Sequence, residues 1–134
     1  RALKSHGYED IITNDLDCMR EAHAHYDAST ARFGFGRKPN VVVTNPPFNK
    51  AFPILLNLHA QNMSVAMLLR LTFLEPTKER GEWLAAHPPT QLIVLPRYSF
   101  TGDGKTDSVT CAWMVWDRFD DRHGVVIVPR KECE

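Results

Sequence analysis

Two adjacent prolines directly follow a run of β-branched residues, and this junction constrains the fold more than any other segment. Val41, Val42 and Val43 form a continuous apolar run, which is typical of a strand buried on both faces of a parallel sheet. Pro46 and Pro47 follow at once, and prolines cannot continue the hydrogen-bond ladder of a central strand. The chain must therefore leave the sheet at the carboxyl end of this strand.

Apolar runs and helical patterns alternate along the chain, which predicts strands joined by crossover helices. A first helix is expected to end at Gly7, a residue suited to a left-handed cap. We expect strands over residues 8–13, 41–43, 64–74, 91–95, 109–116 and 125–128, and helices over 16–27, 52–63 and 77–86. Alternating apolar side chains in 109–116 favour antiparallel pairing at one edge. The predicted fold class is α/β, with a mostly parallel sheet and an antiparallel edge.

Length and composition fit one globular domain over residues 1–134, because 43% of the residues are hydrophobic and 24% are charged. Sixteen basic and sixteen acidic residues cancel, so overall charge does not indicate a polyanion-binding protein. No apolar run reaches the roughly 20 residues of a membrane span. The absence of a signal-peptide pattern and an odd number of cysteines favour a cytoplasmic protein.

Metal binding is the weakest of the chemical possibilities in this sequence. Cys18, His23 and His25 lie close together, with Glu21 between them. A structural zinc site usually has four ligands with paired spacing, and no Cys-x-x-Cys pair is present. The sequence therefore predicts no metal site.

Asn45-Pro46-Pro47-Phe48 has the residue types that chemistry on an amino group requires. Ligands of open α/β sheets bind outside the carboxyl ends of the strands, which is where this tetrad is expected. An amine on an aromatic base or an amide has a delocalised lone pair and attacks a methyl donor poorly. The Asn45 side-chain oxygen and the Pro46 carbonyl are two acceptors for its N–H groups, held in direction by the proline peptide. Phe48 offers an apolar face on which a flipped base can stack.

The tetrad and its flanks resemble the adenine-N6 DNA methyltransferases that use S-adenosylmethionine, whose motif is (Asp/Asn/Ser)-Pro-Pro-(Tyr/Phe/Trp). Residues 7–16 are similar to the second strand of that family, and residues 102–116 to the late strand and preceding loop of phage and prophage members. The resemblance implies a Rossmann-like methyltransferase fold in a bacterial or phage-infected cell. It also implies methyl transfer to adenine N6, with Asn45, Pro46, Pro47 and Phe48 as the catalytic motif.

The resemblance also assigns residues to the cofactor, S-adenosylmethionine. Asp15 is the candidate for the cofactor ribose, with Asn14 as its neighbour, although capping of a following helix is an alternative role for Asp15. The family usually carries an acidic residue near the cofactor adenine, which residues 30–35 lack, and Phe33 or Phe35 is the candidate for covering the adenine ring instead. The family's Gly-rich loop belongs before the helix that ends at Gly7, so we expect the N-terminal strand to be missing. We therefore expect the chain alone to bind the cofactor weakly or not at all.

Basic residues gather around the tetrad, since no acidic residue lies between Asp27 and Glu75. Such residues supply affinity for phosphates without reading sequence. The candidates for nucleic-acid contacts are Arg37, Lys38, Lys50, Arg97 and Lys105. DNA is therefore the expected partner. RNA or a protein glutamine as the methyl acceptor remains an alternative, as does a catalytically silent subunit whose partner chain supplies the missing N-terminal segment.

Overall fold

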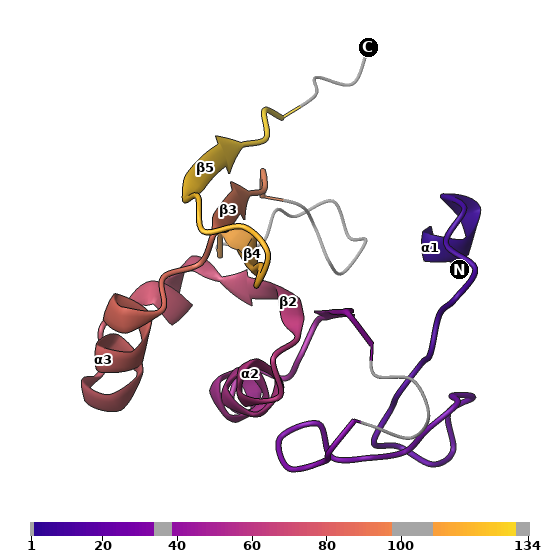
Figure 1. Cartoon of the computed structure of the whole chain (residues 1–134). Helices are drawn as coiled ribbons and strands as arrows, with labels where there is room; N and C mark the ends of the chain where they lie inside the picture. Colours follow the sequence, from indigo (N-terminus) through magenta and orange to yellow (C-terminus); the bar gives the residue numbers. More distant parts are fainter. Residues whose placement is uncertain (1, 34–38, 98–108, 131–134) are drawn as a thin grey trace.

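The computed structural model describes residues 2–33, 39–97 and 109–130 and has an α/β architecture with one mixed sheet (Figure 1). The elements in chain order are α1 (Ala2–Ser5), β1 (Val41–Thr44), α2 (Ala51–Ala60), β2 (Ser64–Arg70), the 3₁₀ helix η1 (Leu71–Leu74), α3 (Lys78–Ala86), β3 (Gln91–Val94), β4 (Cys111–Trp116) and β5 (Gly124–Ile127). The five strands lie in the order β1-β2-β4-β3-β5. This arrangement is consistent with a Rossmann-like fold.

Four of the strands, β1, β2, β3 and β5, run in one direction, and β4 runs against them. β1 pairs in parallel with β2, and β3 pairs in parallel with β5, whereas β4 is antiparallel to both β2 and β3. The predicted antiparallel pairing of residues 109–116 is confirmed, but its place at an edge is wrong. All six residues of β4 are apolar and none is exposed, and a strand with two apolar faces is best placed in the interior of a sheet.

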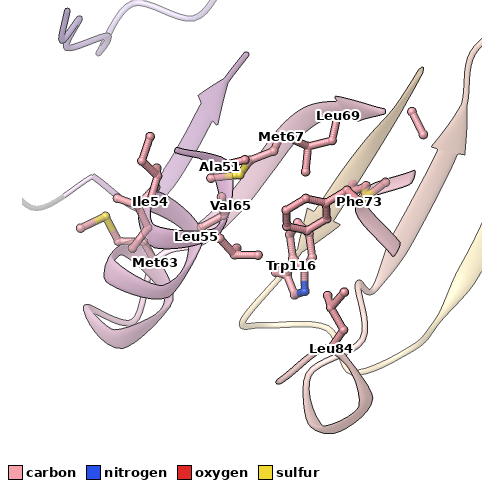
Figure 2. Packing of buried hydrophobic residues seen from close by; sticks show 13 residues of the cluster. Ala51, Ile54, Leu55, Met63, Val65, Met67, Leu69, Phe73, Leu84 and Trp116 are labelled. Atoms are coloured by element: carbon pink, nitrogen blue, oxygen red, sulfur yellow. The ribbon is translucent and has the colours of Figure 1, made fainter. Parts of the chain in front are cut away.

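The hydrophobic core lies between one face of the sheet and the two longer helices (Figure 2). β2 and β4 place Met67 opposite Met114 and Val65 opposite Trp116, so the buried side chains of both strands share this face. In Figure 2, Trp116 lies between Phe73 and Leu84. The buried members from α2 are Ala51, Ile54, Leu55 and Leu58. Packing of α2 on β2 therefore fixes the β1–α2–β2 unit that contains the tetrad.

The expectation that the run of valines is buried on both faces is wrong. Val41 is 56% exposed and Val43 is 49% exposed, while Val42 packs against the core. β1 ends the order of paired strands, and its partner within the described residues is β2 alone. One face of an edge strand can remain in solvent, which explains the exposure.

Two predictions in the N-terminal segment are also wrong, because residues 8–13 form no strand and residues 16–27 form no helix. An isolated bridge joins Asn14 to Ala24 instead. The carboxylate of Asp15 accepts the Asp17 N–H, and that of Asp17 accepts the Met19 N–H, both at 3.0 Å. Such local side-chain bonds compete with helix formation. Figure 1 shows α1 set apart from the sheet.

Two further boundaries can be compared with the sequence. Gly7 has φ +85° and its N–H donates to the Lys4 carbonyl, which confirms the predicted glycine cap. The strand expected over 64–74 ends at Arg70, and the chain continues as η1, closed by a hydrogen bond from the Glu75 N–H to the Thr72 carbonyl. The change from strand to 3₁₀ helix turns the chain away from the sheet at the carboxyl end of β2.

Candidate active site

The tetrad lies where β1 ends and the chain turns into α2. Pro46 is buried, whereas Asn45 and Phe48 are exposed, Phe48 by 49%. The Lys50 N–H donates to the Pro47 carbonyl at 2.9 Å and closes the turn, and the Ile54 N–H then donates to the Lys50 carbonyl at 3.0 Å. The turn is thus anchored by a buried proline and by the first turn of a packed helix, while the two chemically useful side chains face outward.

The two acceptors that the chemistry requires have no hydrogen-bond partner in the described part of the chain. Among the described residues, neither the Asn45 side chain nor the Pro46 carbonyl takes part in a hydrogen bond within the protein. A primary amine has two N–H donors, and an amide oxygen and a carbonyl oxygen can accept one each. Rigid elements on both sides of the turn favour a fixed direction for these acceptors.

Arg70 lies directly beside Phe48, because β1 and β2 are parallel and their carboxyl ends meet at the same edge. The guanidinium carbon of Arg70 is 4.2 Å from the centroid of the Phe48 ring, within the range of a cation–π contact. Arg70 belongs to the basic stretch that the sequence places around the tetrad, but it is not among the predicted nucleic-acid contacts. The sequence pattern that could have indicated Arg70 is its position as the charged residue that ends the apolar run of β2.

Two of the five predicted nucleic-acid residues lie in the described part, and both lie near the carboxyl ends of the parallel strands. Lys50 is exposed and immediately precedes α2. Arg97 is exposed and follows the carboxyl end of β3, which runs in the same direction as β1. Arg37, Lys38 and Lys105 lie outside the described residues. The structure therefore places Lys50 and Arg97, together with Arg70, on the side of the sheet that carries the tetrad.

An acidic side chain, that of Asp27, partly offsets the charge of Lys50. The pKa of Asp27 lies below its ordinary value because the Ser29 hydroxyl and the Ser29 backbone N–H donate hydrogen bonds to the carboxylate, and because Lys50 adds a smaller favourable charge. Asp27 thus places a carboxylate near the tetrad turn, although it lies far from the tetrad in the sequence.

Asn14 and Asp15 both have hydrogen-bond partners within the chain. The Asn14 amide donates to the Tyr26 carbonyl at 3.0 Å and accepts the Tyr26 N–H at 2.9 Å. The Asp15 carboxylate accepts the Asp17 N–H, and its second oxygen is 3.9 Å from Nε of Arg20. Asp15 caps a turn, although no helix follows it.

Phe33 lies at the far end of α2 from the tetrad. Its backbone N–H donates to the Gln61 side chain at 2.8 Å, and its ring packs against the core. Gln61 follows the last residue of α2, whereas the tetrad precedes the first, and a ten-residue helix is about 15 Å long. Phe35 lies outside the described residues. Phe33 therefore does not lie at the tetrad, whereas Asn14 is hydrogen-bonded to Tyr26, the neighbour of the Asp27 carboxylate that lies near Lys50. S-adenosylmethionine stays a prediction.

A hollow of about 210 Å³ lies at the end of the sheet opposite the tetrad. The residues that line it include His59, His87, His123 and Arg118. The pKa of His59 lies below its ordinary value, chiefly because of burial and also because of the nearby His87. Within residues 2–33, 39–97 and 109–130, no group of three or more His, Cys, Asp or Glu side chains is placed to hold a metal ion.

Searches of protein-family models, of curated proteins and of solved structures find no match to this chain. None of the helices in the described ranges is long and apolar enough to span a bilayer. The family that the tetrad resembles therefore stays a prediction, and the proposed function depends on the geometry of the site.

Proposed function

We propose that this chain is the acceptor-binding part of an N-methyltransferase that acts on an exocyclic amine, namely adenine N6 in DNA. The observation that supports the proposal most is the placement of the tetrad. Asn45 and Pro46 lie at the carboxyl end of a parallel strand, with acceptors that have no partner among the described residues, and Phe48 is exposed two residues further on.

In this proposal Asn45 and Pro46 activate the amine by binding both of its N–H groups. The Asn45 Oδ1 and the Pro46 carbonyl each accept one N–H, which draws electron density toward the nitrogen and weakens its conjugation with the ring. Positive charge develops on the nitrogen as it is alkylated, and two oriented oxygen dipoles stabilise that charge where it forms. Phe48 supports the base by stacking, a contact worth roughly 1–3 kcal/mol.

S-adenosylmethionine is the methyl donor in this proposal. Because Phe33 lies at the other end of α2 from the tetrad, the role derived for this chain is the binding and orientation of the acceptor. The same observation favours a second candidate function, a catalytically silent subunit with a methyltransferase-like fold.

DNA is favoured over a protein acceptor because Lys50, Arg70 and Arg97 lie at the edge of the sheet that carries the tetrad. Basic side chains of this kind bind phosphates. A protein glutamine has the same delocalised nitrogen, and RNA has the same phosphates, so both remain alternative acceptors.

Methyl transfer measured on three acceptors in parallel tests the proposal. The chain is incubated with tritiated S-adenosylmethionine at millimolar concentration, because we expect weak binding of this cofactor. The acceptors are a mixed-sequence DNA duplex, a mixed-sequence RNA and a pool of glutamine-containing peptides. We expect label in DNA, recovered as N6-methyladenine by mass spectrometry. Label in RNA or peptide alone would assign the alternative acceptor, and no label in any acceptor would favour the silent subunit.

A further inference from the structure

A small pocket adjoins Phe48 at the carboxyl edge of the sheet. Its volume is about 260 Å³, and it is lined by Phe48, Arg70, Thr72, Phe73, Glu75 and Arg80. Binding pockets for whole small molecules usually measure roughly 300–1,000 Å³. The size therefore suits one chemical group of a larger ligand.

Two guanidinium groups line this pocket, and one has an unused donor. The Arg70 guanidinium lies on the Phe48 ring, and the Arg80 guanidinium carbon lies 5.1 Å from the centroid of the Phe73 ring. Arg80 Nη2 donates to the Glu75 carbonyl at 3.1 Å, whereas Arg80 Nε is shielded from solvent and has no hydrogen-bond partner among the described residues. Buried donors without a partner are rare in folded proteins. The Arg80 guanidinium therefore keeps N–H groups that no described residue accepts.

The charges of the pocket favour an anion. Arg70 and Arg80 carry two positive charges, and Glu75 is the one carboxylate among the lining residues. Planar guanidinium groups match the geometry of phosphate oxygens and bind them with charge-assisted hydrogen bonds. Phosphate is thus the ligand chemistry that fits best.

Phe48 connects this pocket to the acceptor site, since the same ring forms a wall of the pocket and is the expected stacking surface. Phe48 remains 49% exposed despite its contact with Arg70, so part of the ring is accessible to a base. We propose that Arg70 and Arg80 bind a phosphate of the nucleotide whose base stacks on Phe48. This inference rests on the proposed function and adds to it a site that holds the nucleotide backbone.

Binding of two small probes to the isotopically labelled chain, followed by NMR, tests this phosphate site. 2′-Deoxyadenosine reports on stacking, and 2′-deoxyadenosine 5′-monophosphate adds one phosphate. We expect the monophosphate to bind about tenfold more tightly, the change that corresponds to one charge-assisted hydrogen bond. The Arg80 Nε–H resonance should shift with the monophosphate and not with the nucleoside. Inorganic phosphate alone should shift the same resonance only at much higher concentration.

Arg80→Gln should remove the advantage of the monophosphate, and Arg70→Gln should reduce it. Arg70 is exposed, so its variant keeps the test valid if Arg80→Gln fails to fold. Arg122→Gln is the matched control, because it removes the same charge from a residue that pairs with Asp120 before the amino end of β5. Arg122→Gln should leave the advantage of the monophosphate unchanged.

Equal affinities for the two probes, or an advantage that persists in both Arg70→Gln and Arg80→Gln, would overturn the phosphate site. If the nucleoside still binds and Phe48→Ala abolishes its binding, the proposed acceptor site survives that result. Failure of both probes to bind would overturn the phosphate site and the proposed function together.

Discussion

Replacing Leu55 with Ala tests whether packing of α2 on the sheet holds the tetrad in place. Leu55 is fully buried in the core cluster that includes Val65 and Met67. A Leu→Ala change at such a position removes apolar contacts and leaves a cavity, at a cost of about 3 kcal/mol within a usual range of 2–5 kcal/mol. Leu56 is only half-buried and is the matched control on the same helix. Its replacement should cost about 1 kcal/mol.

The free energy of unfolding is measured in urea, with tryptophan fluorescence as the signal, since Trp116 is one of three tryptophans and is buried. At a slope of about 1–3 kcal/mol per molar urea, the midpoint for Leu55→Ala should fall by roughly 1–3 M with the slope unchanged. The midpoint for Leu56→Ala should fall much less. Equal losses in the two variants would refute the packing of α2 described here, and with it the reason for a fixed tetrad turn.

Two further predictions concern α3 and the histidine cluster. A Cβ added at Gly81 would lie 2.9 Å from Pro76 Cβ and 3.0 Å from Pro76 Cα, so the cost of overpacking should exceed the helix-propensity gain of about 1 kcal/mol, and Gly81→Ala should lower the free energy of unfolding by about 1 kcal/mol. Gly124→Ala is the control, because a Cβ there would have nothing within 4 Å. A higher melting temperature for Gly81→Ala would contradict the close approach. Burial and His87 lower the folded-state pKa of His59 from 6.5, so the folded state disfavours protonation of His59 and the free energy of unfolding should decrease as the pH falls below about 6.5. His59→Gln should show a weaker decrease in urea midpoint between about pH 7.5 and pH 5. An unchanged decrease would contradict the buried environment of His59.

The element types could be predicted wherever tertiary packing agrees with local pattern. The strands at 41–44, 91–94, 111–116 and 124–127 and the helices at 51–60 and 78–86 all carry clear apolar periodicity or turn signals. The position of β4 within the sheet could have been inferred from its six apolar residues. The exposure of Val41 and Val43 could not, because a buried strand and an edge strand share the same β-branched composition.

The N-terminal segment was mispredicted for a local reason. Residues 16–27 have helical spacing of apolar residues, but Asp15 and Asp17 bind backbone N–H groups within their own turns. Side-chain capping of this kind is visible only once the backbone conformation is known.

Part of the candidate site could be predicted from the sequence, and part could not. The tetrad was placed correctly at the end of a strand, because the prolines themselves determine where the chain leaves the sheet. Arg70 and Arg80 join the site through the pairing of β1 with β2 and the folding of η1 and α3, which bring distant residues together. Phe33 was assigned by position in the sequence, and the hydrogen bond to Gln61 holds it at the other end of α2.

The rate of methyl transfer by an Asn45→Ala variant tests the central claim most directly. Asn49→Ala is the matched control, since Asn49 is also exposed and lies in the same turn. With DNA as acceptor and millimolar S-adenosylmethionine, we predict that Asn45→Ala lowers the rate on the order of 100-fold, as expected for loss of one oriented group at a developing charge. Asn49→Ala should stay close to the unmodified chain. Equal rates for the two variants would contradict the role assigned to the tetrad.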